Sequence, residues 1–124
     1  MSELSARGVR VLVVDDDVAV RGACRAALEL EGFLVDTASD GFEAVRRFHD
    51  APARVLVCDI FMPGKDGFET ISELTRDYRG LEIVAMTGGE PLHLDLARLL
   101  GARETLAKPF GADELVAAVR RAAE

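Results

Sequence analysis

Three short apolar runs in the chain each end at charged residues. They are the runs 11–14, 55–58 and 106–107, which lead into Asp15, Asp16 and Asp17, into Asp59, and into Lys108. Segments that are apolar throughout are typical of strands buried on both faces, as in a parallel sheet. Ligand sites of open parallel sheets lie outside the carboxyl ends of the strands, so we expect these charged side chains to meet at one edge. Clustered carboxylates are unfavourable there unless they bind a cation or carry out chemistry.

Strand and helix patterns alternate along the chain. Strands are expected at 9–14, 33–38, 55–59, 82–86 and 104–107, with the second strand near an edge of the sheet. Helices are expected at 18–31, from a cap at Asp40 to about 49, and at 68–78, 91–100 and 111–123, with a turn-rich loop at 62–67. Five such units predict a doubly wound (βα)5 protein of the α/β class, with a parallel sheet covered by helices on both faces.

Composition narrows the possible functions. A chain of 124 residues fits one domain, 1–124, with a core of about 9–123. Its net charge of −7 argues against direct nucleic-acid binding. No apolar run approaches the roughly 20 residues of a membrane span, and residues 1–8 lack a signal-peptide core, so we expect a cytoplasmic protein. Cys24 and Cys58 are interpreted as reduced core thiols.

The charged residues have the chemistry of a phosphoryl-transfer site. Asp15, Asp16 and Asp59 offer hard oxygen ligands that suit Mg²⁺, and no His or Cys set favours zinc or copper. A carboxylate beside a bound cation can attack a phosphoryl group, while Lys108 adds positive charge and the Thr87 hydroxyl donates to an oxygen. Each residue alone could be a helix cap, a turn residue or a solvated side chain. Their joint position at the ends of apolar runs favours the site.

Four segments resemble the receiver domains of two-component response regulators. They are the acidic pair after the first strand (11–16), the phosphoacceptor motif D-x-x-M-P-x-x-D-G (59–67), the switch-threonine strand end (86–88) and the K-P-F motif (108–110). Segments 40–44 and 101–102 match weaker family positions. The resemblance covers about 9–123 and implies a flavodoxin-like sheet with strand order 2-1-3-4-5. It also implies a phosphorylation-activated switch, which is an enzyme only toward its own phosphotransfer and autodephosphorylation.

The resemblance also implies a role for each site residue. Asp59 would accept the phosphoryl group and, with Asp16 and the backbone carbonyl of Phe61, would bind Mg²⁺ directly, whereas Asp15 would act through a metal-bound water. Lys108 would pair with Asp59 or with its phosphoryl group.

Two further implications concern the switch itself. Thr87 would move inward to hydrogen-bond the phosphoryl group, and the Lys108–Pro109 peptide bond would be cis.

Implied partners are a sensor histidine kinase or a histidine phosphotransfer protein, and a downstream protein or covalently linked output domain. The signal would leave through the face built from the last two helices and the fifth strand, which could also form a homodimer. The chain ends just after the last helix, so we expect a stand-alone receiver, with the excised receiver of a longer regulator as the alternative. The sequence does not identify the kinase or the pathway.

Several positions depart from the family pattern or stand out. Thr105 occupies the place where the family usually has an aromatic residue whose rotamer changes with the state of the switch. Asp17 makes a third consecutive acid, with capping or solvent exposure as its expected role. Phe61 and Gly89 flank the expected phosphoryl site, and Gly88 with Gly89 predicts a permissive loop.

The fourth helical region, 91–100, is rich in leucine. Some of these leucines are expected in the core, and the remainder could form a partner patch. His49 and His93 are interpreted as surface residues.

Two other functions remain open. A haloacid-dehalogenase-type phosphohydrolase would also use an aspartyl-phosphate and Mg²⁺, starting from Asp15-x-Asp17, but Ala19 lies where it needs Thr or Val and the 59–67 motif would have no role. A degenerate interaction module that no longer accepts phosphate would agree with Thr105 in place of the usual aromatic residue, although every expected site residue is present.

Overall fold

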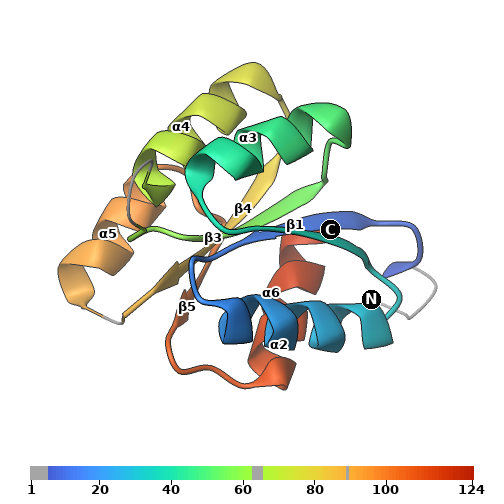
Figure 1. Cartoon of the computed structure of the whole chain (residues 1–124). Helices are drawn as coiled ribbons and strands as arrows, with labels where there is room; N and C mark the ends of the chain where they lie inside the picture. The colour runs from blue at the N-terminus through green and yellow to red at the C-terminus, as the bar shows by residue number, and fades with distance from the viewer. Residues whose placement is uncertain (1–5, 63–65, 89) are drawn as a thin grey trace.

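A central five-stranded parallel sheet organises the protein, whose computed structural model describes residues 6–62, 66–88 and 90–124 (Figure 1). The strands, in spatial order β2-β1-β3-β4-β5, are β1 (Arg10–Val14), β2 (Leu34–Ala38), β3 (Val55–Asp59), β4 (Glu82–Thr87) and β5 (Glu104–Ala107). The helices are α2 (Val18–Leu30), α3 (Gly41–Asp50), α4 (Gly67–Asp77), α5 (Pro91–Leu99) and α6 (Ala112–Ala123). The predicted fold class and strand order are confirmed, and β2 lies at an edge.

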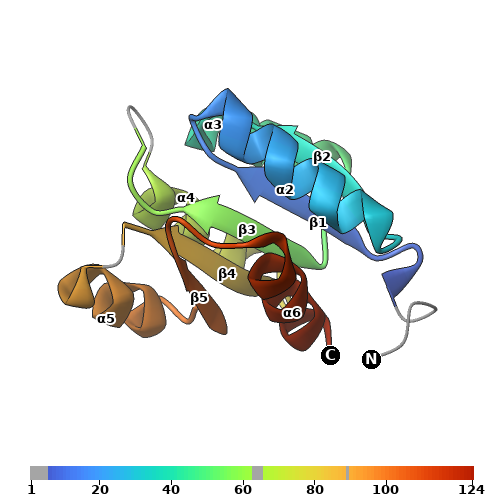
Figure 2. The same ribbon diagram turned by 90° about the horizontal axis from the view of Figure 1, so that it is seen from below.

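Helices cover both faces of the sheet, and each face has its own core. Helices α2 and α6 lie on one face, and α3, α4 and α5 lie on the other (Figures 1 and 2). Along β1, Val11 and Val13 point into the first core, whereas Leu12 and Val14 point into the second. All five residues of β3 are buried, as its unbroken apolar run predicts.

Three helices begin at aspartates that follow the strands. The Asp17 carboxylate accepts hydrogen bonds from the backbone N–H groups of Ala19 (2.8 Å) and Val20 (3.4 Å), so its predicted capping role is confirmed. Asp40 caps α3 in the same way, and Asp66 caps α4. These caps place helix N-termini at the edge of the sheet where the strands end.

Both cysteines lie in the cores as free thiols, as expected. Burial raises the pKa of Cys24 to about 11 and also raises that of Cys58, so both stay protonated at neutral pH.

Helix α5 contributes little fully buried surface. Some leucines of 91–100 were expected in the core; Leu100 packs partly buried against it, and Ala97 is the one fully buried residue of α5. Leu92 and Leu99 are 64% and 83% exposed. This short helix packs against β4 and β5, at the side of the sheet where β5 forms the edge (Figure 2). Strand β4 also continues to Thr87, one residue beyond its expected end.

Some predictions lie partly or wholly outside the described residues. They concern the N-terminal leader (1–5), the centre of the turn-rich loop (63–65) and Gly89 of the expected permissive loop. Over the parts of the chain that the structure describes, no helix is both long and apolar enough to cross a membrane.

Candidate functional site

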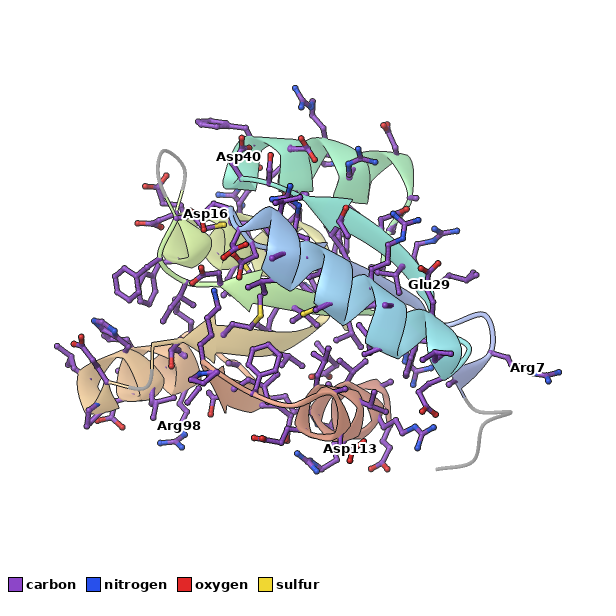
Figure 3. The ribbon with its side chains drawn as sticks, turned by 60° about the horizontal axis from the view of Figure 1, so that its bottom comes forward. Arg7, Asp16, Glu29, Asp40, Arg98 and Asp113 are labelled. Carbon is purple, nitrogen blue, oxygen red and sulfur yellow. The ribbon has the colours of Figure 1, made fainter. Side chains whose placement is uncertain are left out.

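The carboxyl ends of three strands bring the predicted charged residues together. Val14 of β1 pairs with Cys58 of β3, so Asp15 and Asp59 follow neighbouring positions in the sheet. Asp16 lies at the N-terminal end of α2 on this same edge (Figure 3). Lys108 follows β5, and its side chain reaches back across the end of β4 to this pair.

Lys108 joins two buried carboxylates. Its Nζ donates to Oδ2 of Asp15 at 2.6 Å and to Oδ2 of Asp59 at 3.1 Å. Asp15 is fully buried and Asp59 nearly so, and because both partners are charged these contacts are charge-assisted hydrogen bonds. The expected pairing of Lys108 with Asp59 is present in the structure. The shorter contact with Asp15 was not predicted, because strand ends show which residues meet but not which atoms touch.

Burial and hydrogen bonding shift the pKa values of Asp59 and Lys108 in opposite directions. Burial raises the pKa of Asp59, although the Phe61 N–H and the Lys108 ammonium both act to lower it. Burial also lowers the pKa of Lys108, but the bonds to Asp15 and Asp59 outweigh it, so its pKa lies above the ordinary value. Lys108 therefore stays charged at neutral pH.

Three carboxylates lie close enough to share a cation. Asp15, Asp16 and Asp59 each offer one oxygen, and these oxygens all lie within 4.8 Å of one another. Asp16 is exposed, whereas the other two are buried. Hard oxygen donors around a solvent-facing opening match the preference of Mg²⁺, which keeps several waters. The residues present therefore fit the predicted metal.

Backbone contacts hold Asp15 in place. Its Oδ1 accepts from the Asp17 N–H at 2.9 Å, and its backbone carbonyl accepts from Nη1 of Arg21 at 2.7 Å. The contact of Arg21 was missed by sequence reasoning. Arg21 belongs to no motif, and its only signal is its place in the first turn of the helix after the acidic residues.

Thr87 ends β4, and Lys108 directly follows the adjacent strand β5. Thr87 is buried at the end of β4, opposite Ala107 in the register. Its carbonyl accepts a hydrogen bond from the Lys108 N–H at 2.7 Å. The peptide bond between Lys108 and Pro109 is cis, as expected. The threonine and the lysine thus lie on the same edge as the carboxylates.

Gly67 allows α4 to pack directly on the backbone of the site. A Cβ atom at this position would lie 2.3 Å from both the carbonyl oxygen of Asp59 and the Cα of Ile60. The Gly67 N–H donates to the Ile60 carbonyl at 3.2 Å. Only glycine therefore fits at this close approach, which gives a physical reason for the final residue of the 59–67 motif.

The segment after Asp59 contacts the site with its backbone. The Phe61 N–H donates to Oδ1 of Asp59 at 3.0 Å, and the Phe61 ring packs against His93 of α5. His93 was expected at the surface; its side chain is 22% exposed, so it is a partly covered surface residue whose ring contacts that of Phe61. The sequence has no signal for this contact, which joins two distant elements.

The chain matches the model of a known protein family. The model described as response regulator receiver domain matches residues 11–120. The chain belongs to this family. Receiver domains are signalling components of two-component systems and not classical enzymes, which favours the signalling hypothesis over the phosphohydrolase.

Similar proteins include full-length regulators. The response regulator MprA of Mycobacterium ulcerans is 39% identical over 113 residues, which cover 90% of this chain and 49% of the relative. A transcriptional regulatory protein CpxR homolog of Haemophilus influenzae is 37% identical over 112 residues, covering 90% and 48%. The chain thus spans about half the length of the curated relatives it matches.

Solved structures of receiver domains agree closely with this fold. The chemotaxis protein CheY4 of Vibrio cholerae has a TM-score of 0.86 at 30% identity, covering 92% of this chain and 98% of that one. The receiver domain of NtrX from Brucella abortus has a TM-score of 0.85 at 31% identity, covering 91% and 97%.

Replacing Gly67 should test the close approach of α4 to the site. We expect Gly67→Ala to lower the free energy of unfolding by about 2 kcal/mol or more, because the methyl group meets backbone that cannot move aside alone. Chemical denaturation measures this change.

A matched control is Gly22→Ala in α2, where a Cβ would meet nothing within 4 Å. This change should raise the free energy of unfolding by about 0.5–1 kcal/mol. Equal effects of the two substitutions would contradict the packing role of Gly67.

Proposed function

We propose that this receiver domain, residues 1–124, is a switch that accepts a phosphoryl group on Asp59. The donor is a sensor histidine kinase or a histidine phosphotransfer protein. The observation that supports this most is the position of the Asp59 carboxylate, which lies at the carboxyl edge of the sheet beside Lys108 and two further aspartates. As with other receivers, we place the reaction in the cytoplasm.

The proposed reaction moves one phosphoryl group between two side chains. A carboxylate oxygen of Asp59 attacks phosphorus, a new P–O bond forms, and the P–N bond to the donor histidine breaks. Asp16, Asp59 and the Phe61 carbonyl would hold Mg²⁺ directly and Asp15 through a water, and the ion would neutralise charge on the phosphoryl oxygens. Lys108 supplies a second positive charge that is already in place.

The same residues respond once the phosphoryl group is present. Lys108 pairs with the new oxygens, and the Thr87 hydroxyl turns inward to donate a hydrogen bond. Hydrolysis of the acyl phosphate, which the domain assists on itself, resets the switch.

The phosphodonor is proposed to dock beside Lys108. A groove of about 390 Å³ lies there between α2 and α6, and its lining is mostly apolar, with Val20, Ala23 and Phe110 among its residues. Such a groove suits apolar side chains of a donor helix packed next to the reacting groups. Because α2 forms one side of this groove, we propose that its exposed face contributes to the choice of kinase.

The output is proposed to leave through α5, β5 and α6. Leu92 and Leu99 on α5 are exposed large apolar side chains on this face. They could contact a downstream protein, a covalently linked output domain or a second copy of the chain in a homodimer. The two curated relatives described above carry further sequence outside the matched half.

Phosphorylation by a small donor separates the switch from a degenerate module. After incubation with acetyl phosphate and Mg²⁺, intact mass should increase by one phosphoryl group in the wild-type protein. Asp59→Asn should show no increase, because it lacks the nucleophile. A wild-type protein that neither gains mass nor binds Mg²⁺ would favour the degenerate module.

Magnesium binding tests the acidic cluster. We expect Asp16→Asn to weaken Mg²⁺ affinity at least about tenfold, because a charged ligand is lost from the exposed side of the site. Isothermal titration calorimetry measures the affinity. Asp17→Asn is the matched control, since asparagine caps α2 equally well, and its affinity should stay within about twofold of wild type. Equal losses in both variants would contradict the assigned ligand set.

A further inference from the structure

An aromatic contact joins the segment after Asp59 to α5. The rings of Phe61 and His93 lie with their centroids 4.2 Å apart and are tilted by 46°. The ring of Phe68, in the first turn of α4, meets Phe61 edge-on at 5.6 Å. Phe61 is 49% exposed, and its two ring contacts join the segment after Asp59 to both α4 and α5.

Phe61 also contacts the site through its backbone. Its N–H donates to Oδ1 of Asp59 at 3.0 Å, and its carbonyl is the proposed backbone ligand of Mg²⁺. Phe61 lies only two residues after Asp59 in the chain, so the position of its ring and the position of these two backbone groups are coupled. A contact that fixes the ring therefore fixes part of the phosphoryl site.

Helix α5 has little fully buried surface. Ala97 is its one buried residue, and its cap residue Glu90 makes no side-chain capping hydrogen bond. The Glu90 carboxylate instead lies 3.7 Å from Nε2 of His93. Strand β5 carries Thr105 at the position where the family usually has an aromatic residue. The contact of His93 with Phe61 is therefore a direct path between the site and α5.

We propose that His93 is a positioning residue: by packing on Phe61 it holds the segment after Asp59 against α5 and couples the phosphoryl site to that helix. The inference rests on the proposed function of Asp59. Coupling of this kind is reciprocal, so a phosphoryl group at Asp59 alters the environment of α5, and anything that binds α5 alters the stability of the phosphoryl group.

The test compares His93→Ala with His93→Phe, which restores a ring, and with Leu92→Ala, an exposed neighbour on the same helix. Each protein is phosphorylated with acetyl phosphate and Mg²⁺, the donor is removed, and loss of the adduct is followed by intact mass. Amide hydrogen exchange of α5 is measured with and without the adduct, and thermal unfolding checks that all variants are folded.

We expect His93→Ala to shorten the lifetime of the phosphoryl group about 3- to 10-fold, the size expected for one aromatic contact. The change in α5 exchange on phosphorylation should also be lost. His93→Phe and Leu92→Ala should behave like wild type. The thermal unfolding midpoints should stay equal in all variants. A purely structural role of His93 would instead lower the midpoint of His93→Ala.

Three results would overturn the inference while leaving the proposed function intact. They are a wild-type lifetime in His93→Ala, equal shortening in Leu92→Ala, or failure of His93→Phe to restore the lifetime. Absence of any adduct on the wild-type protein would instead refute the proposed function, and the inference would fail with it.

Discussion

The arrangement of the site depends on one ammonium group between two buried carboxylates. Lys108 bonds Asp15 and Asp59, which come from the ends of the neighbouring strands β1 and β3, while Lys108 itself follows β5, two places beyond β3 in the sheet. Two carboxylates buried side by side would repel each other without it. One positive charge does not balance them, and Asp16 adds a third negative charge nearby. The site is therefore held together and still attracts a cation.

The excess of negative charge at the site connects its structure with the proposed switch. A domain whose site were fully neutralised would have little reason to bind Mg²⁺ or to respond to a phosphoryl group. Here the charges are held by a rigid sheet edge, with Gly67 letting α4 pack directly on the backbone beside Asp59. The neighbouring helix α5, in contrast, has one buried residue. A rigid site beside a weakly packed helix suits a domain in which small local changes move an output surface.

Sequence patterns predicted the sheet and the meeting of the charged residues, because apolar runs and their ends are local properties. They were less specific where tertiary packing decides. The leucines of 91–100 were expected to divide between core and surface, and only the structure shows that Leu92 is exposed while Leu100 packs against the core. The contacts of Arg21 with Asp15 and of His93 with Phe61 join side chains through the fold, and no spacing in the chain indicates them. Lys108 and Asp15 are 93 positions apart in the sequence, so no local pattern indicates their contact either.

The most direct test of this account follows the Asp59 carboxyl carbon by NMR as pH is changed, in the wild-type protein and in Lys108→Met. Burial raises the pKa of Asp59, and the Lys108 ammonium acts against that rise. Removing the ammonium should therefore move the titration of Asp59 to higher pH, since the charged carboxylate loses its partner. The same titration in both proteins would contradict the central role of Lys108.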